Sequence, residues 1–168
     1  MTATVELTGR LKIKQALTVA GIAKSVIADF DFADSLANGT GLDQCDLVYA
    51  AKAVAISGSG TNNLDVAGTL TDFYGTVITA VKIKFFYFKN LSVTAGDTIT
   101  LGNHATGALL LWGGATETKT VGPNGVEFIW EPSLAGVPVT ATTGDLLKIL
   151  ENAGNANTYD IAFGGTSA

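Results

Sequence analysis

The 168-residue sequence contains few residues of the kinds that carry chemistry: one cysteine, one histidine and three prolines. A single cysteine cannot form an intramolecular disulfide, so the fold must be held by its core. Charged residues make up only 15% of the chain and hydrophobic residues 47%, which excludes intrinsic disorder and a coiled coil. The net charge of −5 is opposite in sign to that of most nucleic-acid binders, so we expect no nucleic-acid partner.

Long apolar runs are also missing. The longest runs, among them Ala108 to Trp112, cover five residues, which is too short to cross a bilayer. The start of the chain, MTATVELTGRLKIK, lacks the apolar stretch of a secretory signal peptide. We therefore expect a protein that is made in a cytoplasm and has no membrane partner.

The sequence is rich instead in threonine and glycine, with 22 and 20 copies. Threonine favours pleated, half-buried surface, and glycine favours turns. Strand-like segments separated by turn signals follow one another along the chain after residue 44, which predicts an all-β, antiparallel sandwich or barrel. The segments that carry this pattern are 45–57, 64–75, 76–89, 94–103, 116–121, 126–132, 136–142, 145–152 and 158–164, of which 145–152 could instead be a short helix.

Two N-terminal segments, residues 3–14 and 25–32, alternate apolar and polar residues. They could pair as an antiparallel ribbon that works as an extended arm, or they could be the first two strands of the sandwich. Gly9 interrupts the first segment and could mark a bulge. We expect an N-terminal arm or β-ribbon over residues 1–40 and a β-sandwich domain over residues 41–168.

The strongest strand signal is the segment 76–89, TVITAVKIKFFYFK. Alternation places Phe85 with Ile83 on one face and Phe86 with Lys84 on the other. Because aromatic residues occupy both faces, one face can fill the core while the other needs a cover. Either the N-terminal segment or a neighbouring subunit could supply that cover.

Catalytic motifs are not evident. His104 lies in a glycine-rich turn, and the sequence has no GxSxG motif to join it in Ser–His–Asp catalysis, so we interpret it as a polar turn residue. Glu127 and Glu131 lie on one expected strand about 13 Å apart, which is too far for a glycosidase pair. We expect no enzymatic activity.

Metal sites are not indicated either. Asp29, Asp31 and Asp34 lie close together but lack the spacing of a calcium-binding loop, so we interpret them as a solvated strand face. Cys45 and His104 are too few and too far apart in sequence for a zinc site. Cys45 has an acidic neighbour, which favours the neutral thiol, and we interpret it as a small buried hydrophobe. We expect no metal and no other cofactor.

Three stretches of the chain carry a family likeness: 35–57 (SLANGTGLDQCDLVYAAKAVAIS), 64–90 (LDVAGTLTDFYGTVITAVKIKFFYFKN) and much of 122–168, from GPNGVEFIWEP to the end. They resemble small, β-rich virion structural proteins of tailed bacteriophages. The resemblance implies a jelly-roll-like sandwich that acts as a capsid cement or decoration protein. It would sit on the capsid exterior, bind the major capsid protein as a dimer or trimer, and be made in the host cytoplasm.

Two alternatives remain open at this point. The chain could be a tail, neck or head-fibre component of the virion. It could also be a carbohydrate-binding module for host attachment, with Trp112 beside Asn103 and His104 as the candidate sugar site.

The sequence also predicts an interface formed by aromatic anchors and by lysines whose stems cover apolar neighbours. The candidates lie in the N-terminal segment, in the segment 76–89 and at the two tryptophans. They are Lys12, Lys14, Phe30, Phe32, Lys82, Lys84, Phe86, Phe88, Trp112 and Trp130.

Overall fold

A computed structural model of the chain describes residues 4–19 and 22–168 and contains, within those ranges, twelve strands and no helix. In the N-terminal strands, the side chains at positions 10, 11, 13–19, 22–28 and 30 lie outside the described residues. The sheets are antiparallel apart from one short parallel pair, as the sequence predicts for an all-β chain, and their arrangement is consistent with a β-sandwich. No helix long and apolar enough to cross a bilayer occurs among the described residues.

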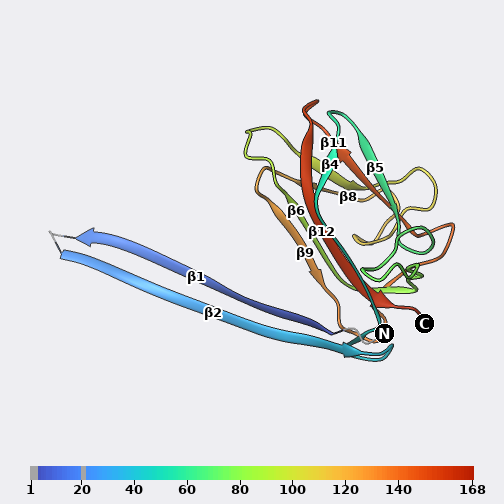
Figure 1. Cartoon of the computed structure of the whole chain (residues 1–168). Coiled ribbons are helices and arrows are strands. Elements are labelled where there is room, and N and C mark those ends of the chain that lie inside the picture. Colours follow the sequence, from blue (N-terminus) through green and yellow to red (C-terminus); the bar gives the residue numbers. More distant parts are fainter. Residues whose placement is uncertain (1–3, 20–21) are drawn as a thin grey trace.

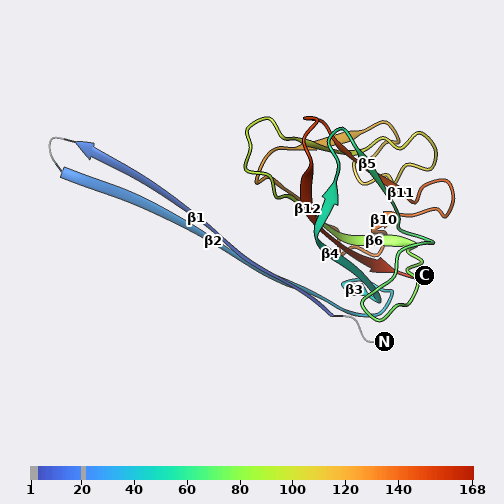
Figure 2. The same cartoon turned by 45° about the horizontal axis from the view of Figure 1, so that its top comes forward.

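The first two strands form a two-stranded ribbon, β1 (Val5–Val19) and β2 (Ile22–Asn38). They pair antiparallel from Val5↔Leu36 to Val19↔Ile22 without a register shift. At 15 residues and about 3.3 Å per residue, β1 is about 50 Å long. Figures 1 and 2 show the ribbon projecting away from the sandwich, to which it is joined at one end. The short strand β3 (Gln44–Cys45) pairs in parallel with the end of β2.

Gly9 does not form a bulge, contrary to the sequence-based suggestion, because the register of the ribbon is continuous. It pairs with Phe32, whose ring lies over it: a Cβ atom at position 9 would come within 2.1 Å of the Phe32 Cζ atom. An aromatic ring that covers a cross-strand glycine is a recognised way to stabilise a strand pair. The glycine is therefore needed for the packing of Phe32.

The rest of the chain forms two sheets (Figure 1). The first sheet has the order β4-β12-β6, and both β9 and β10 pair with the other edge of β6. Its strands are β4 (Leu47–Ile56), β12 (Asn157–Thr166), β6 (Lys82–Asn90), β9 (Val126–Trp130) and β10 (Val137–Pro138). The second sheet has the order β5-β11-β7-β8; its strands are β5 (Thr61–Asp65), β11 (Leu146–Glu151), β7 (Ile99–Gly102) and β8 (Thr118–Val121). The segment 145–152 is thus a strand and not a short helix.

The main core lies between the two sheets. Phe86, Phe88 and Phe163 of the first sheet are at most 1% exposed, and Leu101 and Ile149 of the second are fully buried. Burial of one such side chain is worth about 1.5 to 3 kcal/mol, so this cluster supplies much of the stability of the fold.

The observed strand β6 differs from the sequence-based prediction in its first residue and in the faces of its side chains. The strand begins at Lys82, not at residue 76. Alternation predicts Ile83 and Phe85 on one face, but Ile83 lies in the main core with Phe86, while Phe85 lies on the opposite face of the sheet. The cause is a register shift against β12, where Gly164 pairs with Phe85 and the next glycine pairs with Ile83. The extra residue inverts the face pattern of the strand.

Candidate interaction surface

The ribbon is packed against the sandwich through a second apolar cluster, here called the joint. Leu36 and Cys45 are fully buried there, and Phe85 is 7% exposed. The partly buried side chains of the joint are Val5, Val48, Trp130 and Ala162. The N-terminal segment therefore supplies the cover over the outer face of β6 at Phe85.

Hydrogen bonds fix the ribbon at the joint. The Trp130 indole Nε1 donates to Asp34 Oδ2 at 2.7 Å, which links β9 to β2. The backbone N–H of Asp43 donates to the Pro132 carbonyl at 3.0 Å, and the N–H of Ala37 donates to the Asp43 carbonyl at 2.9 Å. An apolar cluster and directional bonds from β2 and the loop that follows it hold the ribbon against the sandwich.

The structure confirms the prediction that Cys45 is a small, buried hydrophobic residue. Its thiol donates to the Leu47 carbonyl at 3.1 Å. Burial raises the pKa of the Cys45 thiol to about 11, and the adjacent Asp46 carboxylate adds to the rise in pKa to a smaller extent. A neutral thiol of this kind is a poor nucleophile.

The raised pKa of Cys45 predicts a loss of stability at high pH. Folding favours the neutral thiol, so this stabilisation is complete below the unfolded pKa of 9.0 and is lost as pH rises through about 11. We expect the free energy of unfolding to fall by about 2 to 3 kcal/mol more in the natural chain than in Cys45→Ala between these limits. Urea titrations of both proteins at several pH values measure the difference. Equal pH slopes would contradict the burial of this thiol.

The ribbon has two chemically different faces. Val5, Leu7, Phe32 and Leu36 share the face that continues from the joint, here called the inner face. Phe32 is 51% exposed although it is a large aromatic. The inner face near the joint is therefore apolar except for Asp34, which pairs with Leu7 and accepts the bond from Trp130.

The opposite face of the ribbon is polar. It carries exposed Glu6, Lys12, Asp29 and Asp31, and the register pairs Lys12 with Asp29. Opposite charges at directly paired positions stabilise a strand pair modestly, which agrees with the interpretation of Asp29 and Asp31 as part of a solvated face. Asp34 departs from that interpretation, because it pairs with Leu7 on the inner face and is bonded to Trp130. The side chains of Lys14 and Phe30, both predicted interface residues, lie outside the described residues.

Three predicted interface residues are not on the surface. Phe86 and Phe88 are 1% and 0% exposed and belong to the main core. Lys84 is fully buried at the β6 irregularity, where its Nζ donates to the carbonyls of Pro132 at 3.4 Å and of Ser133. Burial lowers the pKa of the Lys84 amine, and the positive charge of nearby Lys82 lowers it further. These residues support the fold and cannot form a surface contact in the folded chain.

Trp112, the aromatic residue of the candidate sugar site, makes contacts within the fold. Trp112 is half-buried, packs edge-on against Phe86 with ring centroids 6.1 Å apart, and donates its indole N–H to Glu127 at 3.1 Å. Glu127 also pairs with Lys119 at 3.3 Å. The indole and Glu127 are thus engaged inside the fold, where they fix the 105–117 loop onto the sandwich.

The remaining candidates are placed as follows. His104 contacts the backbone of Thr106, as expected for a turn residue. No cluster of three or more metal-ligating side chains occurs in the described part of the chain. Lys82 is half-buried on β6. Trp130, half-buried, lies at the joint and stacks on Phe128 of the same strand, with ring centroids 6.3 Å apart.

No family model, curated protein or solved structure matches this chain. The function must therefore be argued from the geometry of the ribbon, the joint and the exposed aromatic residues.

Exposed aromatics that the sequence-based list omits lie on a tight turn. Phe73 and Tyr74 are 74% and 81% exposed. Asp72 fixes the turn by accepting hydrogen bonds from the backbone N–H groups of Tyr74 at 2.8 Å and Thr76 at 2.9 Å. An aspartate followed by glycine three residues later is a turn signal, and it could have located this tip. Phe128, 40% exposed, was also missed.

Proposed function

We propose that this chain is a non-enzymatic structural protein of a tailed-phage virion, a cement or decoration protein that binds the major capsid protein lattice from outside. The observation that carries the proposal is the ribbon, which is anchored by a buried joint, is about 50 Å long and projects away from the sandwich. The sequence resemblance to phage head proteins points in the same direction. No cofactor is required for this role.

The strand order supports a jelly roll. When the eight longer strands of the two sandwich sheets, β4–β9, β11 and β12, are lettered B to I in chain order, the sheets read B-I-D-G and C-H-E-F. In this order, strands that follow one another in the chain lie mostly in different sheets, as two Greek keys produce. Jelly rolls of this kind form many viral capsid domains. We therefore propose a division into an arm, residues 1–40, and a jelly-roll domain, residues 41–168.

The fixed joint suits an arm that binds. A rigid ribbon loses little conformational freedom when it binds, so more of the contact energy appears as affinity. Both long edges of the ribbon beyond the joint carry backbone groups that can extend a sheet in another protein. Many copies that each bind only the assembled lattice stabilise it by mass action, even when each contact is modest.

A shortened ribbon tests the proposal. Thr8 and Ala33 are paired positions, so residues 9–32 can be replaced by an Asn-Gly turn. The variant keeps Val5, Leu36 and the Asp34–Trp130 bond, and so keeps the joint. We expect its affinity for shells assembled from the phage's major capsid protein to fall at least about a hundredfold, because the arm supplies most of the contact.

The control is the full-length variant Val93→Ser, which changes an 80% exposed side chain outside the ribbon and should bind shells like the natural chain. Circular dichroism and thermal unfolding confirm that the shortened variant keeps its sandwich. If a folded, shortened chain decorated shells with unchanged affinity, the ribbon would not be the binding element.

A further inference from the structure

Three carboxylates are buried among the described residues, and one of them is incompletely bonded. Asp97 is 5% exposed, and its two oxygens accept hydrogen bonds from Asn155 at 3.0 Å and from Ser92 at 2.8 Å. Glu151 is 1% exposed, and both of its oxygens accept backbone N–H groups. Asp145 is 5% exposed, yet its Oδ1 atom has no hydrogen-bond partner within the described part of the chain. A buried carboxylate oxygen without a partner is costly, so Oδ1 of Asp145 points to a ligand.

A backbone carbonyl lies near the same space as this oxygen. Asp145 follows the turn 140–144, and its Oδ2 atom accepts a hydrogen bond from the N–H of Thr142. The loop 105–108 brings Gly107 against this turn. A Cβ atom on Gly107 would stand 3.2 Å from the Thr142 carbonyl oxygen and 3.5 Å from Asp145 Oδ1. One charged and one neutral oxygen therefore border the space in front of a residue that has no side chain to fill it.

Backbone hydrogen bonds hold the two segments in this arrangement. The N–H of Leu146 donates to the Gly107 carbonyl at 2.8 Å, and the N–H of Leu109 donates to the Leu146 carbonyl at 2.9 Å. Thr142 has a φ of +68°, a left-handed conformation that a β-branched residue adopts only under constraint. The geometry around Asp145 Oδ1 is therefore fixed by the fold.

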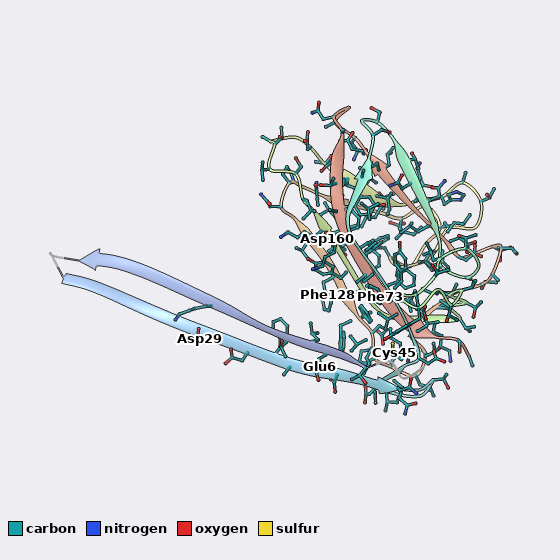
Figure 3. All side chains as sticks on the ribbon, viewed as in Figure 1. Glu6, Asp29, Cys45, Phe73, Phe128 and Asp160 are labelled. Carbon is teal, nitrogen blue, oxygen red and sulfur yellow. The ribbon has the colours of Figure 1, made fainter. Side chains whose placement is uncertain are left out.

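The site lies on the sandwich, away from the ribbon. In Figures 1 and 2, the yellow loop that contains residues 105–108 and the orange loop that contains residues 140–145 lie on the side of the sandwich turned away from the ribbon. Figure 3 shows Glu6 and Asp29 on the ribbon, so these acidic side chains take no part in the site. Thr142 and Thr143 are exposed, so an ion in solution can reach the turn.

We propose that Asp145 Oδ1 and the Thr142 carbonyl oxygen bind a calcium ion, which ties the loop 105–108 to the turn 140–144. Ca²⁺ takes carboxylate and backbone carbonyl oxygens together and completes its coordination shell with water. Its charge offsets the cost of burying a carboxylate oxygen that has no other partner. Both protein ligands are oxygens, whereas zinc and copper prefer nitrogen and sulfur.

This inference departs from the sequence-based expectation of no metal. That expectation considered groups of aspartate, cysteine and histidine side chains, whereas this site combines one side chain with one backbone carbonyl. A single charged ligand predicts weak binding, with a Kd of about 0.1 to 1 mM. The site involves no residue of the ribbon or the joint, so the inference does not depend on the proposed function.

Thermal unfolding of the EDTA-treated chain, with and without CaCl₂, tests the inference. We expect about 10 mM CaCl₂ to raise the Tm by at least about 3 °C, because the ion binds only the folded chain. MgCl₂ should raise the Tm less, since Mg²⁺ demands octahedral geometry and gives up its water reluctantly. NaCl at the same ionic strength controls for screening of surface charges. Titration calorimetry with CaCl₂ measures the binding directly.

Two substitutions should each abolish the calcium-dependent rise in Tm. Asp145→Asn removes the charged ligand. Gly107→Ala keeps the carboxylate but places a methyl group within 3.5 Å of both oxygens. Asp97→Asn is the matched control, since it changes an equally buried carboxylate whose two oxygens are both bonded, and it should keep the rise.

Circular dichroism of each variant separates loss of the ion from loss of the fold. If Asp145→Asn does not fold, Gly107→Ala tests the same site, and if neither folds, calorimetry of the natural chain decides. A natural chain that shows no heat of binding at millimolar calcium, or the same Tm in CaCl₂ and NaCl, would overturn the inference. So would a rise that Asp145→Asn retains in full, or one that Asp97→Asn loses as completely as Asp145→Asn does.

Discussion

Replacing Gly165 with alanine is expected to destabilise the protein by about 3 kcal/mol or more. Gly165 lies in β12 at the register shift against β6, where a Cβ atom would stand 1.8 Å from the backbone carbonyl oxygen of Lys82. A backbone oxygen cannot rotate away as a side chain can, so the two central strands of the sheet would have to separate. Urea unfolding, followed by circular dichroism, measures the loss.

Gly122→Ala is the control for this effect. A Cβ atom at Gly122 would meet no atom within 4 Å, so the substitution should change stability by less than about 0.5 kcal/mol. If Gly165→Ala were as stable as Gly122→Ala, β12 and β6 could not approach each other as closely as the structure shows.

Phe88→Ala is expected to cost about 3 to 5 kcal/mol of stability, because it opens a cavity in the main core. Phe88 is fully buried and stacks on Tyr159, with ring centroids 5.1 Å apart. Phe73→Ala, which shortens a 74% exposed ring, should change stability by less than about 0.5 kcal/mol. Paired thermal or urea unfolding of the two variants gives the comparison.

This prediction also separates the two interpretations of the segment 76–89. An interface aromatic would lose binding and keep stability when truncated. If Phe88→Ala kept the stability of the natural chain and lost only its binding partner, Phe88 would belong to an interface, as the sequence alone suggested.

The N-terminal strand pair was accessible from the sequence because alternation over a long segment marks a strand with two different faces. Residues 3–14 and 25–32 were identified in this way, and the structure extends the first strand to Val19 and the second from Ile22 to Asn38. What alternation could not show is the projection of the ribbon from the sandwich. The same pattern fits a strand pair inside a sheet.

The prediction of which residues share a face in β6 was wrong because the strand is irregular. Alternation assumes an uninterrupted strand, and the irregularity between Ile83 and Phe85 breaks that assumption. The cause lies far away in sequence, at Gly164 and Gly165, where the absence of side chains lets the two strands approach. The burial of Lys84 follows from the same irregularity and from two carbonyl acceptors in the β9–β10 connection. A pattern within the segment 76–89 carries neither signal.

The joint was only partly predictable. The sequence indicated that β6 needs a cover and that Cys45 is buried, but not that the two features meet. The contact depends on Leu36 and on the bond from Trp130 to Asp34, residues separated by more than ninety positions. Such a pairing is a property of the strand order, so it emerges only in three dimensions.

The central claim is that the ribbon is the element by which this chain binds a capsid. Electron cryomicroscopy of intact virions tests the claim most directly. We expect density for the sandwich on the outer surface of the shell, repeated across the lattice, with the ribbon lying against the major capsid protein. Density for this chain only at the neck, tail or fibres, or a ribbon that extends from the shell into solvent without contacts, would contradict it.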